Sequence, residues 1–287
     1  MIDVLKQYEA HAQNGISESE EERYKQLVYI FEEYSSDKKK LRDNKYSFFS
    51  GVITAKDKWL AIGDHYGYES FYFSKFGLNV LPADICVLYL QMAKSLNYIS
   101  EYSEQNAEML TFANNTFDFV FCRDSYHHFP RPVMAVYEML RVAKSGVIIS
   151  EPSDAFFKSP ILLLLCNILD TKNNPVRSRK IWKNRFSFET CGNYVYKVSQ
   201  REFEKLSMGI GLPAIAFRYS NTSNHSENQN KLQRAIMTAL TKIKLIPYPM
   251  LSTILFKIAP SKTTVEKLKK DGWMVYNLPK NPFYDFF

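Results

Sequence analysis

The feature that most constrains the fold is a regular alternation of short apolar runs and amphipathic segments between residues 59 and 151. The apolar runs predict buried strands at residues 59–63, 78–84, 117–124 and 146–152, with a further short strand near 106–110. Apolar residues at helical spacing predict helices at 69–76, 87–96 and 132–142, the last of them ended by Gly146. This alternation predicts βαβ units, and therefore a mostly parallel α/β sheet with helices on both faces.

The remaining segments predict additions to this core. Residues 1–50 are expected to form a helical lid, because their apolar residues recur at helical spacing. Residues 51–155 are expected to form the α/β core. Residues 156–198 break the alternation and are expected to be an insertion that covers the substrate. Residues 199–287 are expected to complete the sheet and to carry a helical segment.

The C-terminal part has its own start and stop signals. Ser199 and Glu202 have the spacing of a capping box, which predicts a helix that begins at residue 199. Residues 213–219 and 273–279 are expected to be strands. Residues 232–258 are expected to be mostly helical, with two prolines breaking the helix.

Composition narrows the class of protein. The net charge is +7, but the basic residues are spread out and no nucleic-acid-binding motif is present, so we expect no nucleic-acid partner. The 4 cysteines form no C-x-x-C pair and the N-terminus lacks a signal-peptide core, which favours a cytoplasmic location. The most apolar run, at 161–169, is too short for a transmembrane segment of about 20 residues. It is expected to be a core helix or the face of a homodimer, with a membrane-surface contact less favoured.

The ends of the first two predicted strands carry the residues of a nucleotide site. The first strand is followed by the segment Gly63-Asp64-His65-Tyr66-Gly67. A glycine between a strand and a helix permits a tight turn and close approach of a ligand to backbone amides. The second strand ends at Asp84, whose carboxylate can accept hydrogen bonds from both hydroxyls of a ribose. The dinucleotide motif G-x-G-x-x-G is absent, which disfavours a dehydrogenase and leaves an ordinary strand-turn-helix open at this point.

Residues 55–155 resemble class I S-adenosylmethionine (SAM) dependent methyltransferases, in particular the type 11 group related to the ubiquinone and menaquinone methyltransferases. The segment ANNTFDFVFCRDSYHHFPRP carries most of the resemblance, and AVYEMLRVAKSGVIISEP continues it. The resemblance implies a Rossmann-like sheet of seven strands in the order 3-2-1-4-5-7-6, with residues 273–279 as the antiparallel seventh strand. It also implies SAM as the cofactor and S-adenosylhomocysteine as the product.

The resemblance further assigns residues to the cofactor. Gly63, His65 and Gly67 occupy the three positions of the family's G-x-G-x-G turn, and residues 106–110 match the loop that holds the adenine. The cofactor-binding candidates are Gly63, Asp64, His65, Gly67, Asp84, Ile85, Asn106, Ala107, Glu108 and Arg123. The chain departs from the family pattern at several of these positions, including His65 and Asn106, which keeps a catalytically degenerate binding protein as an alternative.

Methyl transfer to a hydroxyl needs an aligned acceptor and a base, and it needs no metal. His127 and His128 follow the fourth predicted strand and are candidate bases, because imidazole titrates near neutral pH. Glu151, at the end of the fifth strand, is a third catalytic candidate. Substrate-binding candidates are Asp124, Tyr126, Arg177 and Arg179. Structural roles for all of these residues, such as strand-end packing, a helix cap or a solvated surface, stay open.

The acceptor is expected to be a small molecule or a glycan precursor that is methylated on oxygen. The form GDHYG resembles a subgroup from bacterial surface-polysaccharide gene clusters, which points to a capsule precursor. A C- or N-methyltransferase that acts on a quinone or an amine is the alternative. A quinone predicts a deep apolar tunnel, whereas a glycan predicts an open, polar and basic groove.

Overall fold

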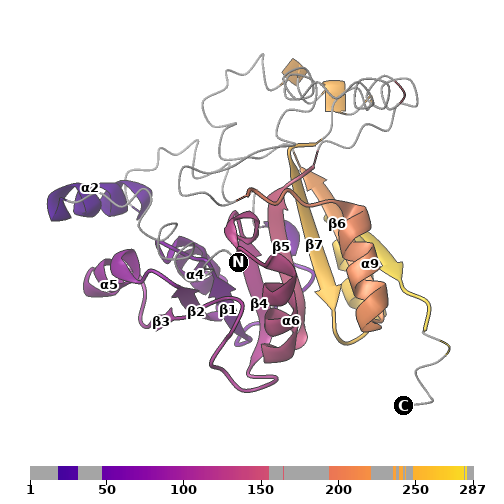
Figure 1. The fold of residues 1–287 in the computed structure, drawn as a ribbon, viewed down its shortest axis with the longest axis horizontal. Coiled ribbons are helices and arrows are strands. Elements are labelled where there is room, and N and C mark those ends of the chain that lie inside the picture. The colour runs from indigo at the N-terminus through magenta and orange to yellow at the C-terminus, as the bar shows by residue number, and fades with distance from the viewer. Residues whose placement is uncertain are drawn as a thin grey trace.

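The computed structural model of the protein describes residues 19–31, 47–154, 194–220 and 248–280, together with positions 164, 235–236, 239–241, 243 and 282. Its centre is an 8-stranded sheet with the strand order β3-β2-β1-β4-β5-β7-β6-β8. Helices cover both faces of this sheet (Figure 1). The predicted mostly parallel α/β architecture is confirmed.

The parallel strands supply the edge at which the candidate site lies. They are β1 (Lys58–Ile62), β2 (Asn79–Asp84), β3 (Ser103–Glu104), β4 (Phe117–Arg123) and β5 (Ala143–Pro152). Because these strands are parallel, their carboxyl ends meet at one edge of the sheet, where ligands bind in open α/β sheets. Three strands complete the sheet by antiparallel pairing: β6 (Ala214–Ser220), β7 (Met250–Phe256) and β8 (Met274–Asn277).

Side chains of the central strands alternate between two buried layers. One layer contains Leu60 and Val120 and packs beneath α6 (Pro132–Val142) and α9 (Gln200–Ile210). The other contains Trp59 and Phe121 and packs beneath α4 (Tyr68–Ser74), α11 (Lys262–Lys270) and the 3-10 helix η1 (Ser47–Phe49). This two-sided burial explains why the parallel strands appear in the sequence as nearly continuous apolar runs.

A third cluster lies towards the β3 edge of the sheet. Helix α2 (Glu20–Phe31) packs there on α5 (Leu88–Ser95), as Figure 1 shows at its left. Leu27 of α2 is fully buried against Tyr89 and Leu90 of α5. The one N-terminal helix that the structure describes is thus anchored to the core.

The largest correction to the sequence prediction concerns residues 250–256. The prediction of a helix is wrong here, because Met250–Phe256 form β7 between β5 and β6. Every residue of β7 is buried, so the strand lacks the polar alternation that distinguishes a strand from a helix. The strand that lies next to β5 in the sheet and pairs antiparallel to it is therefore β7. The predicted seventh strand near residues 273–279 is instead β8, an eighth strand at the edge of the sheet.

Two shorter corrections concern the parallel half. Gly146 does not end α6, which ends at Val142, but lies inside β5, where a Cβ would lie 2.5 Å from the carbonyl oxygen of Leu255. The short strand expected near residues 106–110 is Ser103–Glu104 instead. The helix start at Ser199 is confirmed, because its hydroxyl oxygen accepts a hydrogen bond from the Glu202 amide at 3.2 Å.

Within the ranges given above, no helix is long and apolar enough to cross a bilayer. The predicted insertion at 156–198 falls almost entirely outside the described residues, as do Arg177 and Arg179.

Candidate active site

The turn between β1 and α4 has left-handed backbone at Gly63 and Gly67, with φ of +73° and +76°. At Gly63 there is also a steric reason for glycine, because a Cβ there would lie 2.4 Å from the Cβ of Ser125. Ser125 follows β4, and its hydroxyl donates to the Gly63 carbonyl oxygen at 2.8 Å. The turn after β1 is therefore fixed against the turn after β4, and this contact requires glycine at position 63.

Asp64, a predicted cofactor ligand, makes its hydrogen bonds to residues at the start of α4. Its carboxylate accepts the backbone amides of Glu69 at 3.1 Å and Ser70 at 2.8 Å, and the Ser70 hydroxyl at 2.7 Å. The side chain therefore satisfies amides at the start of α4. Burial raises the pKa of this carboxyl. The arrangement gives Asp64 a positioning role in the turn.

Asp84 ends β2 beside this turn. Burial raises the pKa of its carboxyl to about 7, and the negative charge of Asp64 adds to the rise, although the Cys86 amide donates to Oδ1 at 2.9 Å. A carboxylate that is costly to ionise at a strand end is typical of a ligand-binding group, because new hydrogen bonds from the ligand would stabilise its charge. Ile85, the next residue, is half-buried and packs against the layer beneath α6.

The predicted adenine loop, residues 106–110, is a turn that is stabilised by hydrogen bonds to the side chains of Asn106 and Glu108. The Asn106 side-chain oxygen accepts the Glu108 amide at 2.8 Å, and Ala107 is buried. The Glu108 carboxylate accepts the backbone and side-chain N–H groups of Arg131, each at 2.6 Å. Glu108 thus fixes the loop to the start of α6.

Arg123 ends β4 as a buried cation between two carboxylates. Its Nε lies 3.2 Å from Oδ2 of Asp124, and its Nη1 lies 3.9 Å from Oε1 of Glu69. Asp124 adopts a φ of +48°, a left-handed conformation that Asp tolerates better than most residues. The two predicted residues therefore form a charge cluster with Glu69, which the sequence analysis did not select.

Glu151 is fully buried near the end of β5 and holds the turn that follows β4. Its Oε1 accepts the amides of Ser125 and Tyr126, each at 2.9 Å, and its Oε2 contacts Nδ1 of His127. One carboxylate thus positions both the backbone of the turn and the imidazole beside it. The ring of His128 packs on that of His127, with the centroids 3.8 Å apart.

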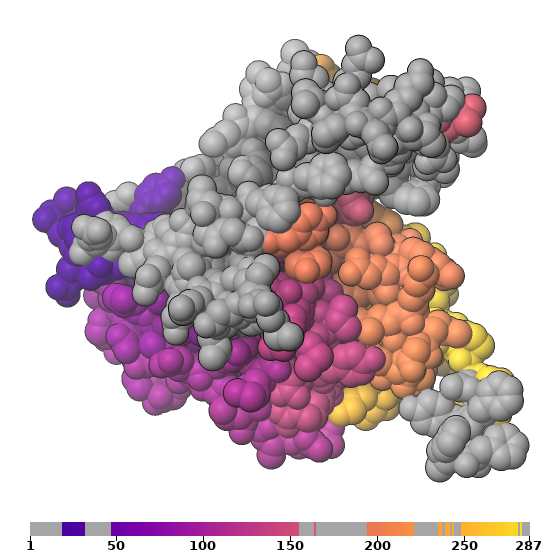
Figure 2. Space-filling model, viewed as in Figure 1, coloured from indigo at the N-terminus to yellow at the C-terminus, as the bar shows by residue number. Residues whose placement is uncertain are grey.

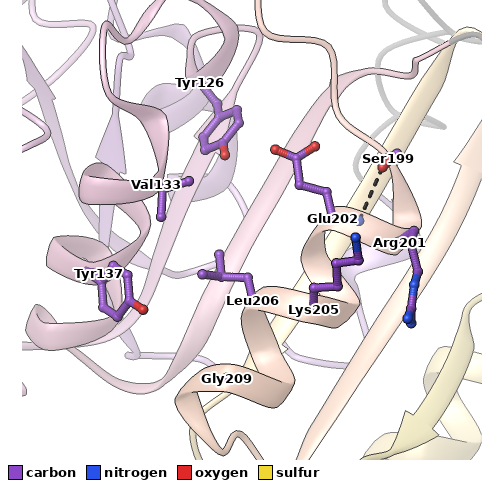
Figure 3. A pocket seen from close by; sticks show the side chains of 9 residues that line it. All are labelled: Tyr126, Val133, Tyr137, Ser199, Arg201, Glu202, Lys205, Leu206 and Gly209. Carbon is purple, nitrogen blue, oxygen red and sulfur yellow. Dashed lines mark hydrogen bonds between the residues drawn. The ribbon is translucent and has the colours of Figure 1, made fainter.

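Tyr126 lies between Ser125 and His127, but its ring belongs to the buried layer beneath α6 and α9. It packs against Phe203 with the ring centroids 5.9 Å apart. Its hydroxyl faces a pocket between the two helices (Figure 3). The predicted substrate residue therefore lines a pocket to which no residue of the glycine turn contributes.

The glycine turn (residues 63–67) also contacts helix α2, through a residue that the sequence analysis did not select. Gln26 of α2 donates to the Tyr66 hydroxyl at 2.9 Å and accepts from the Tyr89 hydroxyl at 2.7 Å. The rings of His65 and Tyr66 pack against each other and against Tyr89, with centroids 4.8 to 4.9 Å apart. Gln26 and Tyr66 are 40 residues apart, so no local pattern could reveal the pairing.

Residues 60–150 match the family model described as a methyltransferase domain. The chain is similar to the structure of a candidate sarcosine dimethylglycine methyltransferase from Galdieria sulphuraria, with 14% identity over 82% of this chain and 98% of that one and a TM-score of 0.50. It is also similar to YcgJ from Bacillus subtilis, with 16% identity over 76% and 99% and a TM-score of 0.49. A comparison with curated proteins gives no match.

The matched segment contains most of β1, all of β2, β3 and β4, and most of β5. The glycine turn, Asp84 and the His127 turn lie at or near the carboxyl ends of β1, β2 and β4. This match identifies residues 60–150 as a methyltransferase domain. The protein is accordingly a methyltransferase, and its cofactor is SAM.

Proposed function

We propose that this methyltransferase acts on a hydroxyl oxygen of a small molecule or glycan precursor, with His127 as the general base. The observation that supports this most is the contact between His127 Nδ1 and the buried carboxylate of Glu151. When Nδ1 carries its proton towards a carboxylate, Nε2 is the nitrogen that accepts a proton. A hydroxyl acceptor must lose its proton during transfer, whereas a neutral amine can attack without a base.

The residues beside the glycine turn fit SAM. The Gly63–Gly67 backbone, at the carboxyl end of β1, would lie along the methionine part. Asp84 would accept the ribose hydroxyls, and the buried turn at Asn106 and Ala107 would lie beside the adenine. SAM supplies an electrophilic methyl group when it is bound. The protein then contributes alignment and a proton acceptor.

In this mechanism His127 would hold the acceptor hydroxyl and take its proton at Nε2, while bound SAM would supply the methyl group and leave as S-adenosylhomocysteine. Glu151 stabilises the imidazolium that results, and it is itself held by the Ser125 and Tyr126 amides. Because these contacts exist before the proton moves, little reorganisation accompanies the transfer. Arg123 is already balanced by Asp124 and Glu69, which favours a positioning role over direct contact with an anionic acceptor.

The test uses SAM labelled with carbon-13 in its methyl group, incubated with the protein and a fractionated small-molecule extract. We expect a labelled product whose carbon chemical shift and mass identify an O-methyl group. A labelled N-methyl or C-methyl product would overturn the choice of oxygen and support the alternative acceptors. Binding of S-adenosylhomocysteine, measured separately by calorimetry, tests the cofactor site independently of the acceptor.

The Gln26 contact leads to a prediction about the cofactor. We expect Gln26→Leu to weaken S-adenosylhomocysteine binding by roughly threefold to thirtyfold, because it leaves the Tyr66 and Tyr89 hydroxyls without their amide partner and loosens α2 from the turn. Calorimetry measures the affinity. Lys25→Leu, one residue away in an exposed ion pair with Glu21, is the matched control and should change it less than twofold. Equal affinities in the two variants would show that α2 does not support the turn.

A further inference from the structure

A pocket lies between α6 and α9, on the face of the sheet that these two helices cover. Its volume is about 550 Å³, within the range of small-molecule sites. None of the residues proposed to hold SAM lines it. In Figure 3 Val133 and Tyr137 of α6 and Glu202 and Leu206 of α9 point into the space between the helices, and the hydroxyl of Tyr126 lies towards the end occupied by Glu202. Figure 2 shows the face of the molecule seen in Figure 1 in space-filling form.

The polar end is formed by Tyr126 and Glu202. Tyr126 is 1% exposed, and among the residues that the structure describes its hydroxyl has no hydrogen-bond partner. A buried hydroxyl without a partner is unfavourable, and a ligand that supplies one would relieve the cost. The Glu202 carboxylate lies on the opposite side of this end in Figure 3. Burial raises the pKa of the Glu202 carboxyl.

The other end of the pocket is apolar and open. Val133 and Tyr137 of α6 are 42% and 50% exposed, although both are hydrophobic, and Leu206 of α9 faces them. Gly209 also lines the pocket, and a Cβ added there would meet nothing within 4 Å. Gly209 is the penultimate residue of α9, and the space beside its Cα is open.

The charges at the pocket disfavour a charged ligand head. Glu202 would repel an anion, while Lys205 and Arg201, which also line the pocket, would repel a cation. Arg201 is partly balanced by Glu204, with 3.3 Å between Nη1 and Oε2. An uncharged head that accepts one hydrogen bond and donates another matches the hydroxyl of Tyr126 and the carboxylate of Glu202.

We propose that this pocket is a second ligand site, which binds an uncharged amphipathic molecule with a carboxamide-like head. The head carbonyl accepts a hydrogen bond from Tyr126, and the head N–H donates to Glu202. A flat apolar body lies against Tyr137, Val133 and Leu206. None of the residues proposed to hold SAM lines this pocket, although the backbone amide of Tyr126 also donates to Glu151 in the turn that carries His127.

The experiment titrates the full-length protein with benzamide, followed by chemical-shift changes in its NMR spectrum, without SAM. Benzoate and benzylamine are probes of similar size with a negative and a positive head. We expect benzamide to bind with a Kd of roughly 0.5–10 mM, a range set by the small number of atoms in the probe, and both charged probes to bind at least about fivefold more weakly. No binding of benzamide at about 20 mM, or equal binding of all three probes, would overturn the proposal.

Variants then locate the bound probe. Gly209→Leu fills the apolar end and should weaken benzamide binding at least roughly tenfold, whereas Gly209→Ala leaves most of the space and should stay within about twofold. Tyr126→Phe removes the hydroxyl and should weaken binding roughly threefold to tenfold. An unchanged affinity for S-adenosylhomocysteine shows that Gly209→Leu is folded. Benzamide binding to Gly209→Leu as tight as to the original protein would place the probe elsewhere and refute the assignment.

Discussion

Replacing Glu151 by glutamine is expected to lower kcat by roughly 10²- to 10⁴-fold, the range that a positioned general base contributes. In the glutamine variant the side-chain oxygen can still accept the Ser125 and Tyr126 amides. The new NH₂ group then faces His127 Nδ1 and forces the imidazole to carry its proton on Nε2. The turn is kept while the base is blocked. Steady-state kinetics with the labelled-methyl assay measures the loss.

Two comparisons make this result specific. Affinity for S-adenosylhomocysteine should stay within about threefold in Glu151→Gln, because the residue does not touch the proposed cofactor residues. His127→Ala should lose activity to a similar extent, whereas His128→Gln should keep most of it. Full activity in Glu151→Gln would refute the proposed pair, and loss of activity only in His128→Gln would move the base to His128.

Replacing Asp84 by asparagine should have opposite effects on cofactor binding and on stability. Loss of the carboxylate that would accept the ribose hydroxyls should weaken S-adenosylhomocysteine binding by roughly tenfold to a hundredfold at pH 8. The unliganded protein should become more stable at this pH, because the variant no longer has a buried charge. Asparagine can still accept the Cys86 amide, so the local backbone is retained. Calorimetry and thermal unfolding measure the two effects.

The pH dependence of the stability gain in Asp84→Asn tests whether ionisation of the Asp84 carboxyl is its cause. The pKa of Asp84 is raised to about 7 in the folded protein from an ordinary value of 3.8, so the folded state holds an extra proton between these values. This group's contribution to stability therefore falls as pH rises through this window, by up to about 1.4 kcal/mol per pH unit, and stays low above pH 7. The stability gain of Asp84→Asn should accordingly be larger at pH 8 than at pH 5. An equal gain at both values would show that ionisation is not its source.

Protonation of the Asp84 carboxylate should also affect the affinity for the cofactor. Ribose hydroxyls donate to the ionised carboxylate, so cofactor affinity in the unsubstituted protein should fall as pH drops below about 7, by at most tenfold per unit. Asp84→Asn should lack this dependence. A persistent pH slope in the variant would assign it to another group.

The parallel half of the fold could be predicted from the sequence because its signals are local. Apolar runs, glycines after strands and the acidic residue at position 84 lie at short, regular spacing. Helix α6 spans the predicted residues 132–142, although the predicted stop signal, Gly146, lies in β5 and does not end it. The antiparallel half lacks such signals. Residues 250–256 are buried on both sides of the sheet, so their apolar run is equally compatible with a helix.

The sequence predicts where the candidate site lies, but not which hydrogen bonds each of its carboxylates makes. The sequence places Asp64, Glu108 and Glu151 at strand ends or near them, but their hydrogen-bond partners come from other elements or later turns. Whether a carboxylate caps a helix, binds an arginine or holds a histidine depends on these distant partners. For the same reason Gln26 could not be selected, since its role depends on two tyrosines far along the chain.

The order of the sheet leaves two edges, and both are short. At one edge β3 is Ser103–Glu104, and at the other β8 pairs with Ala214–Phe217, four fully buried residues of β6. Without β8 this stretch of β6 would present unpaired backbone groups beside an apolar surface, which is a template for strand addition by another molecule. β8 therefore satisfies the backbone groups of the buried part of β6, and the strand that stands at this edge is a short one of four residues, Met274–Asn277.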